Sequence, residues 1–135
     1  MIGEKVQEIV GKITGTRVLA GDGGGVKVET SFQGAGKLVG VDTIELGTYE
    51  STMTPSGHLH GDGHGTSMSP TGDMASWKGS EVGKPTGKGM GASYRYAVYF
   101  QTTSPKWSRL NGVVVVGEWE IDENGNTKGQ GWEWK

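Results

Sequence analysis

The sequence contains no cysteine, which excludes disulfide bonds, thiolate nucleophiles and cysteine-ligated metals. It also has no run of about eighteen apolar residues that could cross a bilayer as a helix. Residues 1–12 lack the apolar segment of a secretory signal. These absences predict a cytoplasmic protein.

Charge of one sign is also lacking, since 13 Lys and Arg residues are scattered among 15 Asp and Glu residues, for a net charge of −2. Without a basic patch, we expect neither nucleic acid nor a membrane surface as a partner. The sequence has no G-x-S-x-G motif, and the glycine-rich residues 21–25 precede an expected strand, not a helix. A serine nucleophile elbow and a phosphate-binding loop are therefore not expected.

Glycine is abundant, at 26 of 135 residues, and interrupts runs of alternating polar and apolar residues about every ten positions. Short strands bounded by Gly, Asn, Asp, Ser and Pro are typical of all-β sandwiches and barrels. We count about eight such strands, and closing them into a barrel removes the two exposed edges of an open sheet. The prediction is one domain, residues 1–135, that forms an antiparallel up-and-down β-barrel.

The expected strands follow the alternation along the chain. The first segment also has apolar residues at helical spacing, so a short helical start is the alternative there. Glycines 34 and 36 are expected to break the second strand. The predicted strands are Val6–Leu19, Val26–Phe32, Leu38–Ser51, His58–Gly65, Asp73–Gly83, Met90–Gln101, Leu110–Ile121 and a short last strand with Trp132 and Trp134.

An eight-stranded barrel either is filled by its own side chains or holds one small ligand. Glycine at every second position of one strand, as at Gly61, Gly63 and Gly65, leaves room for curvature or for large side chains from across the barrel. The five Trp and four Tyr residues can supply those side chains. Aromatic residues of this kind pack a core more often than they contact a ligand.

Three segments of the sequence carry a family resemblance: GHLHGDGHG, DMASWKGSEVGK and YRYAVYFQTTSPKWSRLNGVVVVGEWEIDENGN. They resemble the small bacterial proteins with the allene oxide cyclase-like barrel, and the resemblance covers roughly residues 30–135. It implies an eight-stranded barrel with a central cavity, often assembled as dimers or trimers. In the plant enzymes and related bacterial cyclases that cavity folds an apolar polyene before ring closure. No catalytic residue of those cyclases matches a position in this sequence.

Three histidines and one aspartate share one face of the predicted strand from His58 to Gly65. Alternate residues of a strand lie about 6.6–6.8 Å apart, so two imidazoles can converge on one ion with a carboxylate as third ligand. A solvated outer face is the competing interpretation. The candidate metal ligands are His58, His60, Asp62 and His64; no other cofactor is expected.

The strand from Met90 to Gln101 has two competing faces, one with Tyr94, Tyr96, Val98 and Phe100 and one with Arg95, Tyr99 and Gln101. We predict the Arg95 face inside, with Arg95 paired to Glu118 or Glu50, because this leaves the more apolar face for a subunit interface. The alternative is that these charges point outward into solvent. The predicted ligand-binding residues are Arg95, Tyr99, Gln101, Glu118, Glu50 and Trp77.

Three functions follow from these patterns. The first is binding of a small apolar or amphipathic molecule in the barrel, with isomerase or cyclase chemistry. The second is a carrier or sensor that uses the same cavity without chemistry. The third is a self-assembling structural barrel with a filled core. Apolar residues on both faces of several strands further predict a homo-oligomer, a dimer or trimer.

Overall fold

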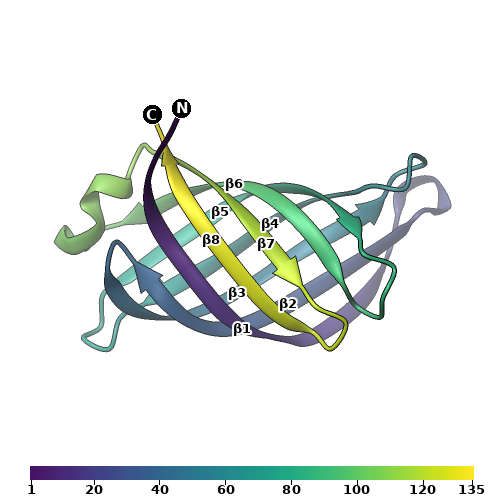
Figure 1. The fold of residues 1–135 in the computed structure, drawn as a ribbon, viewed down its shortest axis with the longest axis horizontal. Coiled ribbons are helices and arrows are strands. Elements are labelled where there is room, and N and C mark those ends of the chain that lie inside the picture. The colour runs from purple at the N-terminus through teal and green to yellow at the C-terminus, as the bar shows by residue number, and fades with distance from the viewer.

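The protein is an all-β closed barrel in which eight antiparallel strands follow one another in chain order and β8 pairs with β1 (Figure 1). The computed structural model describes residues 1–135, except for the burial of Gly24. The strands are β1 (Ile2–Ala20), β2 (Val26–Leu38), β3 (Val41–Met53), β4 (Leu59–Met68), β5 (Met74–Pro85), β6 (Ala92–Thr102), β7 (Val114–Ile121) and β8 (Asn126–Trp134). The predicted eight-stranded antiparallel barrel is confirmed.

Short 3-10 helices interrupt two of the connections. They are η1 (Asp22–Gly24), between β1 and β2, and η2 (Pro105–Leu110), between β6 and β7. Among the described residues, no helix is long and apolar enough to cross a membrane.

The structure corrects three expectations about the strand ends. Residues from Ile2 onward are strand, so the helical alternative at the start is wrong. Glycines 34 and 36 do not break β2, because they lie where β2 passes so close to β1 that a Cβ on Gly36 would overlap the Glu8 carbonyl oxygen. Leu110 belongs to η2 and not to β7, since the chain turns at Pro105 and buries this helix in the barrel.

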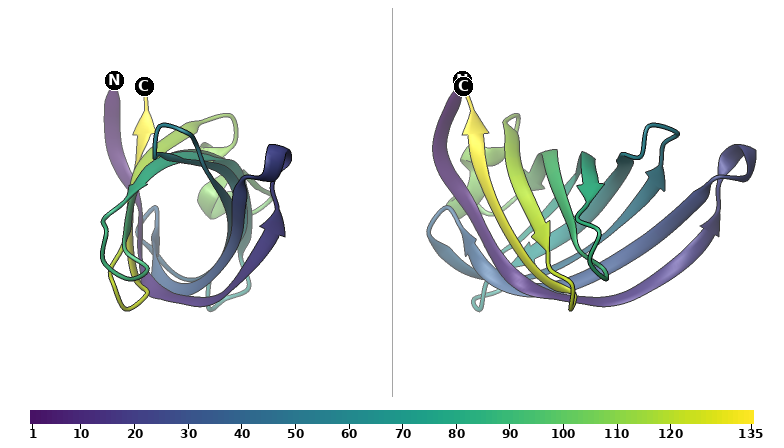
Figure 2. Two further views of the ribbon diagram at one scale, coloured as in Figure 1. Left: turned by 90° about the vertical axis from the view of Figure 1, so that its right-hand side faces the viewer. Right: turned by 45° about the vertical axis from the view of Figure 1, so that its right-hand side comes forward.

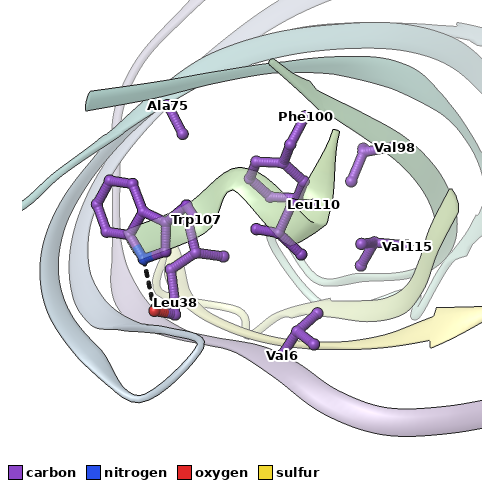
Figure 3. Close-up of a cluster of buried hydrophobic side chains, with 8 residues drawn as sticks. All are labelled: Val6, Leu38, Ala75, Val98, Phe100, Trp107, Leu110 and Val115. Atoms are coloured by element: carbon purple, nitrogen blue, oxygen red, sulfur yellow. Dashed lines mark hydrogen bonds between the residues drawn. The ribbon is translucent and has the colours of Figure 1, made fainter. Parts of the chain in front are cut away.

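One end of the barrel is closed by η2. Trp107 and Leu110 of this helix are fully buried and pack with Leu38, Phe100 and Val115 (Figure 3). The Trp107 indole Nε1 donates a hydrogen bond of 2.9 Å to the Leu38 carbonyl oxygen. Viewed along the barrel from the opposite end, η2 lies across the far opening (Figure 2). We call this the closed end.

The opposite end, which we call the open end, carries a projecting hairpin (Figure 2). Pairing of β1 with β8 ends at Lys12, whereas pairing of β1 with β2 continues to Ala20 and Val26. Residues 13–20 and 26–31 therefore extend beyond the end of β8. The turns β3–β4, β5–β6 and β7–β8 lie at this same end.

Large aromatic side chains fill much of the interior by lying over glycines of neighbouring strands. A Cβ on Gly65 would lie 2.4 Å from the Trp77 ring, and one on Gly117 would lie 2.2 Å from the Tyr96 ring. Gly63 and Gly65 of β4 make room for large side chains, as predicted, but these are Tyr49 and Trp77 of the neighbouring strands and not side chains from across the barrel. The inward side chains therefore determine how much empty space remains inside the barrel.

Candidate functional site

A small central cavity of about 60 Å³ lies among the aromatic side chains in the middle of the barrel. Phe32 is at the centre of the aromatic wall, with its ring centroid 4.5 Å from that of Trp119 and 6.3 Å from those of Tyr49 and Trp77. The polar side chains in the wall include Gln7 and Glu81. The other lining residues are Ile9, Gly63, Gly79, Ser80, Tyr94, Tyr96 and Val98.

A second space of about 250 Å³, which we call the mouth, lies at the open end. It shares Tyr49 and Tyr94 with the wall of the central cavity, so these two side chains lie between the two spaces. Its lining is mostly apolar and comes from the projecting hairpin and the neighbouring turns. The lining residues are Ile13, Val26, Val28, Thr30, Ser51, Met53, Leu59, Pro85, Gly89, Met90, Gly91, Ala92 and Ile121, with Tyr49 and Tyr94.

Three polar side chains meet between the two spaces. The Ser51 hydroxyl lies 3.0 Å from the Tyr94 hydroxyl and donates a hydrogen bond of 3.4 Å to the Glu81 carboxylate. The three residues come from β3, β6 and β5, and each occupies an inward position because it continues the alternation of buried residues in its strand. They form a polar site on an otherwise apolar route into the barrel.

Glu81 has the most useful chemistry in this group. Burial raises the pKa of its carboxyl to about 7, and the nearby negative charge of Asp62 adds to the increase, whereas the Ser51 hydrogen bond opposes it. A carboxyl group that titrates near neutral pH can donate or accept a proton under ordinary conditions. Burial also raises the pKa of Tyr94.

Three further polar atoms of the cavity wall are buried and have no hydrogen-bond partner among the described residues: the Tyr49 hydroxyl, Trp77 Nε1 and Trp119 Nε1. Buried polar groups are usually hydrogen-bonded, and an unpaired one costs free energy. Tyr49 can donate or accept, whereas the two indoles can only donate. The cavity wall thus contains unused hydrogen-bonding capacity.

A second inward carboxyl group, Glu45, lies apart from this site. It is 1% exposed and accepts a hydrogen bond of 2.8 Å from the Ser67 hydroxyl. Burial raises the pKa of Glu45 to about 7. Glu45 does not line the central cavity or the mouth, so it belongs to the core.

The structure corrects the predicted interior face of β6. Tyr94, Tyr96, Val98 and Phe100 point inward, and Arg95, Tyr99 and Gln101 are exposed outside. Arg95 forms an ion pair of 3.1 Å with Glu120 on the outer wall, and not with Glu118 or Glu50. An unpaired guanidinium inside would cost more free energy than this solvated pair.

The other predicted ligand-binding residues also lie either on the outer face of the barrel or in its interior. Glu118 is at an outward position of β7. Glu50 is at an outward position of β3, where it lies 3.6 Å from the Lys27 ammonium. Trp77 points inward and lines the central cavity. Of the six predicted residues, the structure therefore places one in the cavity wall.

The predicted metal ligands do not converge. His60, Asp62 and His64 lie exposed on the outer face of β4, and the His58 imidazole Nδ1 lies 3.0 Å from the Ser56 hydroxyl in the preceding turn. Within the described residues, no group of three or more His, Cys, Asp or Glu side chains could hold a metal ion. The face is polar because the glycines between these residues take the inward positions, so the interpretation as a solvated outer face fits.

Sequence reasoning missed Glu81, Ser51 and Tyr49 as site residues. The signal for Glu81 was present, since it follows Trp77 and Gly79 at the same alternation. Ser51 and Tyr49 share their face with Glu45 in the same way. The alternation within each strand does not predict that β3, β5 and β6 bring these side chains together.

Comparisons with solved structures support the fold. A conserved protein of unknown function from Rhodopseudomonas palustris is 13% identical, with 99% of each chain covered and a TM-score of 0.80. A protein of unknown function from Clostridium acetobutylicum is 13% identical, with 98% of each chain covered and a TM-score of 0.81. A β-barrel-like protein from Acinetobacter baumannii is 15% identical, with 98% of this chain and 94% of that chain covered and a TM-score of 0.80.

Neither a scan against protein-family models nor a search of curated proteins gave a match. At these identities, the structural likeness supports the barrel fold alone.

Proposed function

We propose that the protein binds a small amphipathic molecule through its open end. The observation that carries the proposal is the asymmetry of the barrel: η2 fills one end, whereas at the other end an apolar mouth leads to a buried polar site. The apolar part of the molecule would replace water against Ile13, Val28 and Leu59. Its polar part would reach Glu81, Ser51 and Tyr94.

The size of the site favours a small molecule over a long lipid. The mouth and the central cavity together reach the lower end of the usual range for ligand pockets, about 300–1,000 Å³. Apolar lining with a few convergent polar groups is also the usual character of such pockets. Burial of apolar ligand surface would stabilise the complex by roughly 25 cal/mol per Å² before the costs of association.

An allene oxide cyclase-like subtype, with isomerase or cyclase chemistry, is the finer form of this proposal. It is supported by the sequence resemblance and by Glu81, whose pKa of about 7 suits proton transfer. Turnover of a candidate polyene that Glu81→Gln abolishes would support chemistry. Binding without turnover would support a carrier.

The neutral fluorescent probe N-phenyl-1-naphthylamine tests binding. Two leucines provide a matched pair of variants, because Leu59 lines the mouth and Leu46 lies 42% exposed on the outer wall. We expect saturable fluorescence enhancement in the wild type. Leu59→Gln should weaken the affinity about five- to tenfold, and Leu46→Gln should leave it within twofold.

Circular dichroism of both variants should match the wild type, which separates lost binding from lost folding. Absence of saturable probe binding, or equal losses in the two variants, would contradict binding at the mouth.

A second candidate, self-assembly, is favoured by an apolar row on the outer wall. Val10, Ala35, Ile44, Met68 and Met74 lie directly opposite one another across β1 to β5. Val10, Ile44 and Met74 are more than half exposed. A straight apolar row of this kind can pair with the same row of a second copy about a two-fold axis.

Light scattering after size exclusion at micromolar concentration tests this candidate. A dimer mass that Ile44→Lys converts to a monomer mass would support it. A monomer mass in the wild type at all concentrations would contradict it.

A further inference from the structure

We propose that the molecule bound at the open end is a small organic cation, with its ammonium group against Glu81 and the aromatic rings and its apolar tail in the mouth. This inference rests on the proposed function and names the class of ligand. It is carried by three features of the inner wall, which are its charge, its aromatic rings and an unused acceptor.

The charge of the inner wall has one sign. Glu81 lines the central cavity, and the described linings of the cavity and of the mouth contain no Lys, Arg or His side chain. The charged side chain that shifts the pKa of Glu81 is Asp62, which is also negative. A carboxylate in such a place lacks the cation that would offset its burial.

The aromatic rings add to the same preference. Phe32, Tyr49, Trp77 and Trp119 surround the cavity, and Tyr94 lies with its ring centroid 5.8 Å from that of Tyr49. The negative faces of aromatic rings attract a cation within about 6 Å of the ring centroid, most strongly where water is excluded. A wall of rings beside a carboxylate therefore favours a cation over an anion of the same size.

Hydrogen-bond acceptors for an ammonium group are also present. Tyr49 lines both spaces, and its buried hydroxyl makes no hydrogen bond of good geometry among the described residues, although the Trp119 indole lies near enough to oppose the rise in its pKa. The Tyr49 hydroxyl can accept one ammonium hydrogen while the Glu81 carboxylate accepts another. The Ser51 hydroxyl, which donates to Glu81, stays in place.

The unpaired indole N–H groups of Trp77 and Trp119 argue the other way, because they would suit a ligand with an acceptor oxygen. Magnitude decides between the two preferences. An unpaired N–H costs less free energy than a carboxylate charge that has no cation beside it in an apolar wall. The charge balance at Glu81 is therefore the stronger requirement.

Three probes with the same six-carbon tail test the inference: n-hexylamine, n-hexanol and hexanoate, each titrated at pH 8 as a competitor of N-phenyl-1-naphthylamine. A primary ammonium stays charged at this pH. We expect hexylamine to bind about tenfold more tightly than hexanol, and hexanoate to bind more weakly than hexanol. Glu81→Gln should bring hexylamine to the level of hexanol and leave hexanol within twofold.

Glu123→Gln serves as the matched control, because Glu123 is an exposed acid in the β7–β8 turn at the open end and does not act on Glu81. It should preserve the preference for hexylamine, which would exclude a general effect of net charge. Equal affinities of hexylamine and hexanol, tighter binding of hexanoate, or a preference that survives Glu81→Gln would overturn the inference.

The two proposals fail in different ways. If N-phenyl-1-naphthylamine and hexanol bind and hexylamine is not preferred, the mouth binds ligands but the proposed preference for an organic cation is wrong. If none of the four probes binds, the proposed function itself is wrong.

Discussion

The two ends of the barrel differ in what covers their inward apolar side chains. At the closed end, Trp107 and Leu110 of η2 are fully buried against the strands. At the open end, Val18 and Val26 of the projecting hairpin are 77% and 60% exposed. The strands at both ends alternate in the same way, so the difference arises from the connections.

The connection between β6 and β7 holds a helix whose apolar residues return to the barrel axis, and thereby replaces solvent with packed side chains. The connections at the open end are turns and the short helix η1, and they leave the mouth accessible. A β-barrel of this size therefore acquires a pocket when one end is filled and the other is not. The following variants test whether the two ends have these separate roles.

The largest expected effect is at the closed end. Trp107→Ala removes a fully buried indole and its hydrogen bond to Leu38, so we expect unfolding free energy to fall by about 3–5 kcal/mol. Trp134→Ala is the matched control, since Trp134 is 53% exposed, and should cost less than about 1 kcal/mol. Urea denaturation measures both. Similar losses in the two variants would contradict the closing role of Trp107.

The next effect concerns Glu45, the buried core carboxyl near the closed end. Burial raises its pKa to about 7 in the folded protein, above the usual carboxyl value of 4.5, so the folded state binds the proton more tightly than the unfolded state. The contribution of this group to stability is then full below pH 4.5 and is lost as pH rises through 7.

Glu45→Gln removes this loss and keeps an oxygen that accepts the Ser67 hydrogen bond. We expect the variant to be more stable than the wild type by about 2–3 kcal/mol at pH 8 and nearly equal to it at pH 5. Glu123→Gln, in the exposed β7–β8 turn, should show no such difference. Urea midpoints at the two pH values provide the measurement, and a parallel pH dependence of Glu45→Gln and the wild type would contradict the role of Glu45.

The sequence predicted the barrel because alternation and glycine-rich turns recur along nearly the whole chain. It failed for β6 because both faces of that strand carry aromatic residues, and apolar content alone did not decide between them. The glycines of β4, by contrast, show which face of their own strand points inward. Gly63 and Gly65 lie inside, where Tyr49 and Trp77 need the space, so the histidines of the opposite parity lie outside.

The polar site depends on information that a single strand does not contain. Ser51, Glu81 and Tyr94 belong to different strands, and their contacts follow from the registers of β3 to β6. Alternation places each of them inside, but a shift of one strand by two residues would separate them without changing which face is buried. The expectation of a ligand cavity could therefore be stated from sequence, but of the six residues predicted to line it only Trp77 does so.

A smaller effect is expected between the two ends, where Gly65 lies under the ring of Trp77. Gly65→Ala would place a Cβ 2.4 Å from that ring and 2.5 Å from the Leu46 carbonyl oxygen. We expect a loss of about 1–3 kcal/mol in unfolding free energy from overpacking, together with altered Trp fluorescence. Gly15→Ala, where nothing lies within 4 Å of the added Cβ, should be nearly neutral. Equal stability of both variants and the wild type would show that Trp77 does not need the space.

The smallest effect is expected on the outer wall, at Arg95. Arg95→Met removes an exposed ion pair with Glu120, and such pairs contribute about 0–1 kcal/mol. The probe affinity should stay within twofold of the wild type, because Arg95 does not line the central cavity or the mouth. Glu81→Gln, a neighbouring charge change on the inner wall, should by contrast abolish the preference for hexylamine. If Arg95→Met also abolished that preference while the fold stayed intact, binding would depend on the outer wall. This result would contradict a binding site at the open end.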